Sequence, residues 1–222
     1  MKILILAAMD KEIDLLLNLL DTPEMRIIAG CKVWGGKIGN HQVYLSKCGI
    51  GKVNSAINTL RFIQLMQPDF VLNSGVAGGA GVPIGTVLIA DKVAYHDTWC
   101  GPGTEYGQAD GMPLFMLPYE RILKSVSDEN ISKGLICSGD KFITTAEEIA
   151  FIKSKFPEVK AVDMESASIA QTCNICGLPF AIVRVVSDTP GEGENISQYK
   201  DFWETAPKKT FMVLSKILED LK

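Results

Sequence analysis

Apolar residues lie along this chain in short, continuous runs, each about as long as a β-strand. Within a run the residues are uniformly apolar rather than alternately apolar and polar, which is typical of strands buried on both faces of a sheet. The strands predicted in this way span residues 3–8, 43–48, 70–75, 86–91, 134–139, 160–164 and 180–188.

Helical periodicity occupies several of the intervals between these runs. Asp10 is a candidate N-cap for the first helix, and Thr145 to Glu148 has the pattern of a capping box. Three apolar stripes at helix spacing predict amphipathic helices. They consist of Ile13, Leu16, Leu17 and Leu20; of Val53, Ala56, Ile57, Leu60 and Ile63; and of Phe211, Leu214, Ile217, Leu218 and Leu221.

Strands that alternate with helices predict an α/β fold, a three-layer sandwich whose central twisted sheet is flanked by helices. The sheet is predicted to be mixed, because the strands at 70–75 and 86–91 are joined too tightly for a helical crossover. The chain contains no linker, low-complexity tract or repeat, so residues 1–222 are predicted to form a single domain. In such folds ligands bind at the carboxyl ends of the strands.

Composition narrows the range of partners. With 47% apolar residues, 22% charged residues and a net charge of −4, the chain has no basic excess that would favour nucleic acid or an anionic membrane. The apolar run at 3–8 is short and is followed by Asp10, Lys11 and Glu12, so we expect a buried strand rather than a signal peptide, and a cytoplasmic protein.

The cysteines and histidines do not predict a redox or metal site. The six cysteines are scattered through apolar segments and are expected to be core residues. The pair Cys173 and Cys176 closes a predicted helix, whereas a redox pair opens one. His41 and His96 are the only histidines, so no metal centre is expected.

Three carboxylates, Glu12, Glu165 and Asp188, stand where predicted strands end. The carboxyl ends of these strands are expected to meet at one rim, which would bring the acids around one ligand. The alternative is that each acid caps a helix, a placement that the helix dipole favours by about 0.3–1 kcal/mol. Three acids at three apolar strand ends favour the shared site.

The glycine-rich segments do not match nucleotide fingerprints. Residues 74–81 (SGVAGGAG) are followed by a strand rather than a helix, which disfavours a dinucleotide site and suggests backbone packed against a flat ligand or a neighbouring strand. Residues 49–52 (GIGK) open a helix and could hold an anion, but a tight turn is favoured. Of four arginines, Arg184 alone is near the expected site, which favours water over phosphate as the incoming group.

Several motifs together resemble one family. They are AAMDKE (7–12), SKCGIGKVNSA (46–56), NSGVAGG (73–79), EYGQ (105–108), SGDKFI (138–143), AVDMESASIA (161–170) and VRVVSD (183–188). In order and spacing they are similar to the 5'-methylthioadenosine/S-adenosylhomocysteine nucleosidases of the nucleoside phosphorylase superfamily. The resemblance implies a homodimer that hydrolyses the N-glycosidic bond of adenosines with a 5'-thioether, without cofactor or metal.

The resemblance also implies residue roles. Glu12 would activate water, Asp188 would protonate purine N7, and Glu165 would bind the ribose hydroxyls. These roles suit the reaction, because glycosidic cleavage develops positive charge on the sugar and negative charge on the leaving base. Further substrate contacts would come from Met164 at the ribose; Phe142, Ile143 and Gly78 at adenine; Met9, Ile50 and Tyr199 at the thioether; Ser187 and Arg184 as orienting groups; and the loop from Tyr106 to Pro113 in the neighbouring subunit's pocket.

The chain also departs from the family pattern. Val76 and Ala77 stand where Ser-Ala is common, which removes a hydroxyl near the expected water, and Asp163 replaces a glutamate and is interpreted as a structural partner. Residues 98–104 are one residue shorter than is common, so the 5'-substituent is the least specified part of the substrate. Two alternatives stay open: a purine nucleoside phosphorylase of the same fold, and a nucleoside-binding protein without turnover.

Overall fold

The computed structural model describes residues 1–125, 131–205, 213–214 and 217–218. Nine strands form one sheet in the order β2-β3-β4-β1-β5-β8-β7-β6-β9. The strands are β1 (Lys2–Ala7), β2 (Asp21–Ile28), β3 (Cys31–Ile38), β4 (His41–Lys47), β5 (Phe70–Gly79), β6 (Val87–Tyr95), β7 (Ile131–Ser138), β8 (Val159–Asp163) and β9 (Phe180–Asp188).

The sheet is mixed, as the sequence predicted, and part of it also closes on itself. Strand β5 pairs in parallel with β1 and β9, and β9 pairs antiparallel with β6. The chain of pairings continues through β7 and β8 and returns to β5 at Gly78 and Gly79. The predicted strands correspond to seven of the nine, and β5, β8 and β9 thereby bring their ends to one small region.

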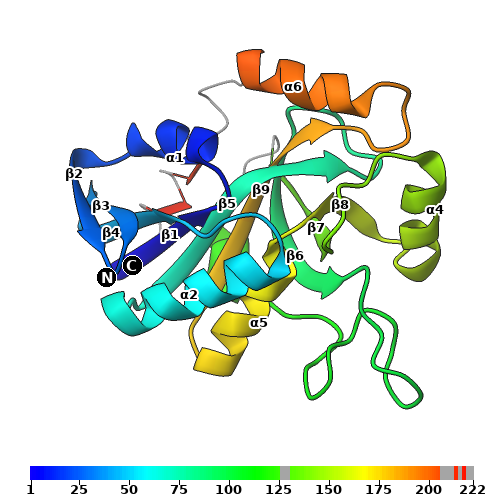
Figure 1. Ribbon diagram of the computed structural model, residues 1–222, viewed down its shortest axis with the longest axis horizontal. Coiled ribbons are helices and arrows are strands. Elements are labelled where there is room, and N and C mark those ends of the chain that lie inside the picture. The colour runs from blue at the N-terminus through cyan, green and yellow to red at the C-terminus, as the bar shows by residue number, and fades with distance from the viewer. Residues whose placement is uncertain (126–130, 206–212, 215–216, 219–222) are drawn as a thin grey trace.

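Helices cover both faces of the sheet, which confirms the predicted sandwich (Figure 1). In the view of Figure 1, α1 and α6 lie above the sheet and α2 and α5 lie below it. Within the described residues the helices are α1 (Asp10–Leu17), α2 (Lys52–Met66), α3 (Glu120–Ser125), α4 (Ala146–Lys155), α5 (Ser166–Cys176) and α6 (Asn195–Thr205). None of these helices is long and apolar enough to cross a membrane.

Strands β2 and β3 were not predicted. Every residue of β2 is exposed or only partly buried, because β2 is the edge of the sheet and pairs on one side only, with β3. A strand with no buried face carries no apolar run, so hydrophobic periodicity cannot detect it.

Most of the apolar stripe of α2 does not face the core, although Ile63 packs against it. Val53, Ile57 and Leu60 are 67%, 60% and 41% exposed, whereas the buried face carries Ser55 and Thr59 together with Phe62 and Met66. The small polar residues pack against α5, where the Ser55 and Ser168 hydroxyls are 2.6 Å apart. A pair of serines at this contact lets the two helices approach closely, and Val53, Ile57 and Leu60 are left on the exposed face.

The structure also tests the predictions for the helix caps, the cysteines and the last apolar stripe. The N-cap of α1 is Met9, and Asp10 is the first residue of the helix, whereas the capping box of Thr145 and Glu148 on α4 is confirmed. All six cysteines are free, but only Cys48, Cys137 and Cys173 are buried, and Cys100 is exposed. In the last predicted stripe Leu214, Ile217 and Leu218 are buried, and Phe211 and Leu221 lie outside the described residues.

Candidate active site

A pocket opens where strands of the closed part of the sheet end next to β1. Its walls come from the segments that follow β1, β4, β7 and β8, from the ends of β5 and β9, and from α6. Thirteen of the sixteen predicted site residues line it: Met9, Glu12, Ile50, Val76, Ala77, Gly78, Phe142, Ile143, Met164, Glu165, Ser187, Asp188 and Tyr199. The convergence of strand ends, expected from the sequence, therefore occurs.

Glu12 is held by main-chain donors. Its Oε2 accepts hydrogen bonds from the Ala8 and Met9 amides at 2.8 and 2.9 Å, and its Oε1 accepts from the Val76 amide at 3.1 Å. Gly75 makes room for this contact, because a Cβ at that position would lie 2.6 Å from Oε1. Glu12 thus caps α1, as the alternative interpretation proposed, and also lines the pocket.

Glu165 is held by the segment that precedes α2. Its Oε1 accepts a hydrogen bond from the Gly51 amide at 2.9 Å, and the next amide, that of Lys52, donates to Asp140 Oδ1 at 2.7 Å. The two amides that could have bound an external anion are therefore bound to carboxylates of the chain. This arrangement favours the tight-turn interpretation of residues 49–52.

Asp163, at the pocket wall, forms a buried ion pair with Arg184, which lies behind the wall. Arg184 donates to Asp163 Oδ2 from Nε and from Nη2, at 2.8 Å in both cases, and its Nη2 also donates to the Asn73 side chain. Ser138 and Ser166 donate their hydroxyls to the same carboxylate, and the Ser166 amide donates to it at 3.3 Å. Asp163 therefore holds Arg184 and the start of α5, in agreement with its predicted structural role.

Asp188 is held by side chains. Ser187 donates to its Oδ1 at 2.7 Å, and the Asn195 amide donates to its Oδ2 at 3.2 Å. Gly78 of β5 lies directly beside this carboxyl group, because a Cβ on Gly78 would be 3.4 Å from Oδ2 and 2.7 Å from Pro190. Both Glu12 and Asp188 therefore pack against glycines of the same strand.

Burial dominates the electrostatics of the three acids. Removal from water raises the pKa of Glu12, although the Arg184 charge and three main-chain amides oppose the rise. Burial and the nearby charge of Asp163 raise the pKa of Glu165 to about 8. Burial also raises the pKa of Asp188, against the hydrogen bonds that its carboxylate accepts. Carboxyl groups with raised pKa values can exchange protons near neutral pH.

Aromatic and sulfur-containing side chains form the remaining walls. Phe142 and Tyr199 meet edge to face, with ring centroids 5.5 Å apart, and the Tyr199 hydroxyl donates to the Met9 sulfur at 3.3 Å. Phe142 is 41% exposed and Ile50 is 48% exposed, so both residues border the pocket opening. A flat, partly apolar ligand could bind between these walls.

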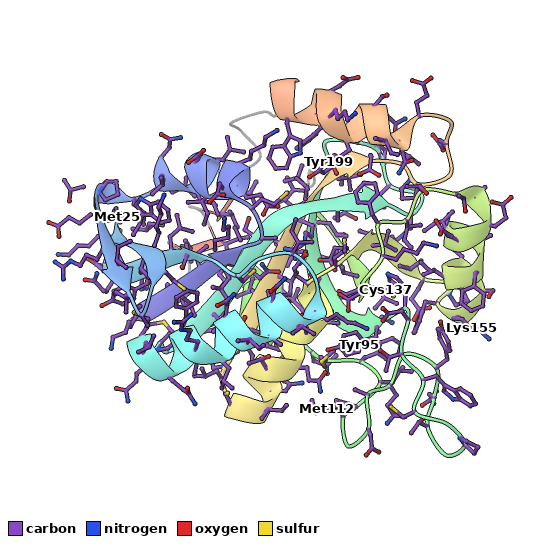
Figure 2. The ribbon with its side chains drawn as sticks, in the orientation of Figure 1. Met25, Tyr95, Met112, Cys137, Lys155 and Tyr199 are labelled. Atoms are coloured by element: carbon purple, nitrogen blue, oxygen red, sulfur yellow. The ribbon has the colours of Figure 1, made fainter. Side chains whose placement is uncertain are left out.

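Three predicted residues lie outside this pocket. Arg184 is buried behind it, in the ion pair with Asp163. Tyr106 donates its hydroxyl to the His96 carbonyl, and Pro113 is exposed. In Figure 2, Met112, beside Pro113, lies in loops that project from the body, well apart from Tyr199. These loops do not reach the pocket of their own chain.

Other residues at or next to the pocket were not predicted. Asn195, at the start of α6, contacts Asp188, while Lys141 and Pro190 line the wall. An asparagine before an apolar residue is an ordinary helix start, so its sequence context carries no functional signal. Within the described residues, no group of three or more His, Cys, Asp or Glu side chains is arranged to hold a metal ion.

Comparison with known proteins identifies the family. Residues 2–219 match the phosphorylase superfamily. The chain is 36% identical over 232 residues to a 5'-methylthioadenosine/S-adenosylhomocysteine nucleosidase of Geobacillus sp. (strain WCH70), with 100% of both chains covered, and 39% identical to one of Exiguobacterium sp., with 99% of both covered.

Solved structures agree with this assignment. The nucleosidase of S. pneumoniae, solved with a transition-state inhibitor, has a TM-score of 0.93 and 37% identity, with 100% of both chains covered. The S-adenosylhomocysteine nucleosidase of Streptococcus pyogenes, solved with 5-methylthiotubericidin, has a TM-score of 0.91 and 33% identity, with 100% of this chain and 98% of that chain covered. The chain therefore belongs to the phosphorylase superfamily and, within it, to the family of 5'-methylthioadenosine/S-adenosylhomocysteine nucleosidases.

Proposed function

We propose that this protein hydrolyses the N-glycosidic bond of 5'-methylthioadenosine, S-adenosylhomocysteine and related 5'-modified adenosines, and releases adenine and the thioribose. The observation that carries the proposal is the convergence of three buried carboxylates, Glu12, Glu165 and Asp188, on one pocket. The names of full-length relatives support the substrate class, and the aromatic wall suits a purine.

Each carboxylate has a separate role in this reaction. Glu12, whose pKa is raised by burial, is a stronger base than an ordinary carboxylate and takes a proton from the attacking water. Glu165, when ionised, stabilises the positive charge that develops on the ribose ring. Asp188, whose pKa is also raised, retains a proton at higher pH and donates it to the leaving purine.

Water rather than phosphate suits the charges around the pocket. Arg184 is bound to Asp163 and does not line the pocket wall. Lys141 does line it, but its ammonium group pairs with Glu148. A phosphate would therefore meet three carboxylates and no free cation among the described lining residues, which is an unfavourable site for an anion.

The 5'-substituent end of the pocket is open. Met9, Ile50 and Tyr199 line it, and Ile50 is about half exposed. A methylthio group would contact these side chains, whereas a longer homocysteine chain would extend past Ile50 into solvent. This geometry supports acceptance of both substituents.

Adenine release in phosphate-free buffer tests the proposal. We expect turnover of 5'-methylthioadenosine to adenine and methylthioribose without added metal or phosphate. Appearance of ribose 1-phosphate derivatives only when phosphate is added would instead identify a phosphorylase. Tight binding of the nucleoside without any adenine release would identify a binding protein.

We also propose that the protein acts as a homodimer that is formed through α2. The exposed apolar residues Ile50, Val53, Ile57 and Leu60, here named the α2 surface, lie on one helix and on the turn before it. Because Ile50 also lines the pocket opening, a second copy on this surface would lie beside the opening. The projecting loop of Tyr106 to Pro113, which does not reach its own pocket, could then contribute to its partner's.

Changing Ile57 to Lys tests the dimer. Burial of a lysine in an apolar interface is costly, so we expect Ile57→Lys to sediment as a monomer while the wild type sediments as a dimer. Ile27→Lys is the matched control, because Ile27 on β2 is 61% exposed and lies outside the α2 surface. A wild-type monomer at micromolar concentration would contradict the proposal.

The cytoplasm is the proposed location of the reaction. All six cysteines are free, with no disulfide among them. Cysteines remain reduced in the cytosol and pair in oxidising compartments, so this thiol content supports a cytoplasmic enzyme.

A further inference from the structure

Asn195 contacts two parts of the pocket at once. It is the first residue of α6 and is only 4% exposed. Its Nδ2 lies 3.1 Å from the Ile143 carbonyl oxygen and 3.2 Å from Asp188 Oδ2. A carbonyl oxygen only accepts hydrogen bonds, so the amide nitrogen must face this side, and its two N–H groups suffice for both partners.

We propose that Asn195 is a positioning residue for the general acid, and that it holds the Asp188 carboxyl group in register with the segment that faces the purine. The inference rests on the proposed hydrolysis. It concerns a residue that the family resemblance did not assign and that does not itself line the pocket.

Asn195 fixes the direction of the acid. Ser187 holds Asp188 Oδ1 and Asn195 holds Oδ2, so the carboxyl group cannot rotate without loss of a buried hydrogen bond. The other N–H of Asn195 holds Ile143, the neighbour of Phe142 in the aromatic wall. The acid and the purine-facing segment are thereby held at a constant separation, which proton transfer to a bound base requires.

Asn195 also limits how weak the acid becomes. Burial raises the pKa of Asp188, and the hydrogen bonds from Ser187 and Asn195 lower it, because they stabilise the ionised form. Loss of Asn195 would raise this pKa further and make Asp188 a poorer proton donor. Other ionisable residues that line the pocket are Glu12 after β1, Asp163 at the end of β8, Glu165 before α5, Lys141 after β7 and Tyr199 on α6.

A neighbouring residue of α6 offers a matched control. Gln198 accepts a hydrogen bond from the Thr189 amide at 2.9 Å, so it ties the segment after Asp188 to the same helix without contact to the carboxyl group. Asn195 and Gln198 are both tethers of α6 to this segment. Only Asn195 bonds to the acid.

The test compares Asn195→Ala and Asn195→Asp with Gln198→Ala and the wild type. For Asn195→Ala we expect kcat to fall about 10- to 100-fold with KM within about threefold, since the lost interaction serves the transition state. The basic limb of the kcat profile, where Asp188 loses its proton, should move to higher pH. Asn195→Asp should be slower still, because it places a second carboxylate beside the acid. Gln198→Ala should retain the wild-type pH profile.

Two outcomes would overturn the inference. One is an Asn195→Ala variant with unchanged kcat and pH profile. The other is a loss in which KM rises, the melting temperature falls and the basic limb stays in place, as a purely structural residue would produce. If the wild type itself releases no adenine, the proposed function fails and the inference with it, whereas an active wild type confines the failure to Asn195.

Discussion

Glu12 and Asp188 line the same pocket, but their carboxyl groups are held by different kinds of donor. Main-chain amides of Ala8, Met9 and Val76 bind Glu12. Side chains of Ser187 and Asn195 bind Asp188. The base side is therefore built from the ends of β1 and β5, and the acid side from residues of β9 and α6.

The two kinds of donor differ in how easily a substitution can remove them. A main-chain donor is present whatever the side chain, so the hydrogen bonds that hold Glu12 depend on the fold alone. A side-chain donor can be removed by one substitution, so the setting of Asp188 depends on particular residues. We expect the position of the acid to be adjustable by substitution of its donors, and the position of the base to be nearly constant.

The largest expected effects come from amide substitutions of the two acids. Glu12→Gln and Asp188→Asn should each slow adenine release by about 10²–10⁴-fold, the usual contribution of a proton-transferring group. For Asp188→Asn this is a loss of about 3–5 kcal/mol of transition-state stabilisation. Steady-state kinetics measures both losses.

Stability should separate the same two variants. In Glu12→Gln the new NH₂ faces main-chain donors, which should lower the free energy of unfolding by about 1–3 kcal/mol. In Asp188→Asn the new amide could turn its NH₂ toward the Ser187 hydroxyl and its oxygen toward Asn195, so this variant should fold normally. Equal unfolding free energies in urea would contradict the distinction between main-chain and side-chain support.

A second effect concerns the charge behind the base side. Arg184→Met leaves Asp163 buried without its cation, which should cost about 3–5 kcal/mol of folding stability. The charge of Arg184 lowers the pKa of Glu12, so the acid limb of the rate profile should move to higher pH in this variant. Arg26→Met, which breaks an exposed pair with Glu24, should leave the melting temperature unchanged. An Arg184→Met variant as stable as the wild type would mean that the ion pair contributes little to folding stability.

A third prediction concerns Glu165, whose carboxyl group accepts a hydrogen bond from one main-chain amide, that of Gly51. Its folded pKa of about 8 lies above the ordinary value of 4.5, so the folded state binds this proton more tightly than the unfolded state. The resulting stabilisation is present below pH 4.5 and is lost as pH rises through 8. Relative to Glu165→Gln, the wild type should lose on the order of a few kcal/mol of unfolding free energy as the pH rises across this range. The prediction would be contradicted if the difference in unfolding free energy between the wild type and Glu165→Gln, measured in urea, were the same at about pH 5 and about pH 9.

The smallest effect lies in α4, the helix that follows the aromatic wall of the pocket. Thr145 caps α4, just after Phe142 and Ile143, by accepting from the Glu148 amide at 3.2 Å. Thr145→Ala should lower the free energy of unfolding by about 1 kcal/mol and should leave the base side intact. Ser154→Ala, at the other end of α4, should have no measurable effect on melting. A loss of unfolding free energy much larger than about 1 kcal/mol would show that the segment around Thr145 is coupled to the rest of the site.

The features that depend on local pattern could be predicted from the amino-acid sequence. Continuous apolar runs predicted seven of the nine strands, because a strand buried on both faces must be apolar throughout. Strand ends predicted where Glu12, Glu165 and Asp188 would meet. Family motifs then identified residues such as Phe142 and Tyr199, which line the pocket although no periodic pattern marks them.

Which surfaces meet could not be predicted and depends on how the elements pack in three dimensions. The tertiary structure placed most of the apolar stripe of α2 outside the core, because Ser55 and Ser168 bring α2 and α5 close together on the other face. It joined Asn195 to Asp188 and Arg184 to Asp163, pairs whose partners are 7 and 21 residues apart. Hydrophobic periodicity records only whether a side chain is buried, whereas a hydrogen bond depends on distance and direction between groups that the folded backbone alone brings together.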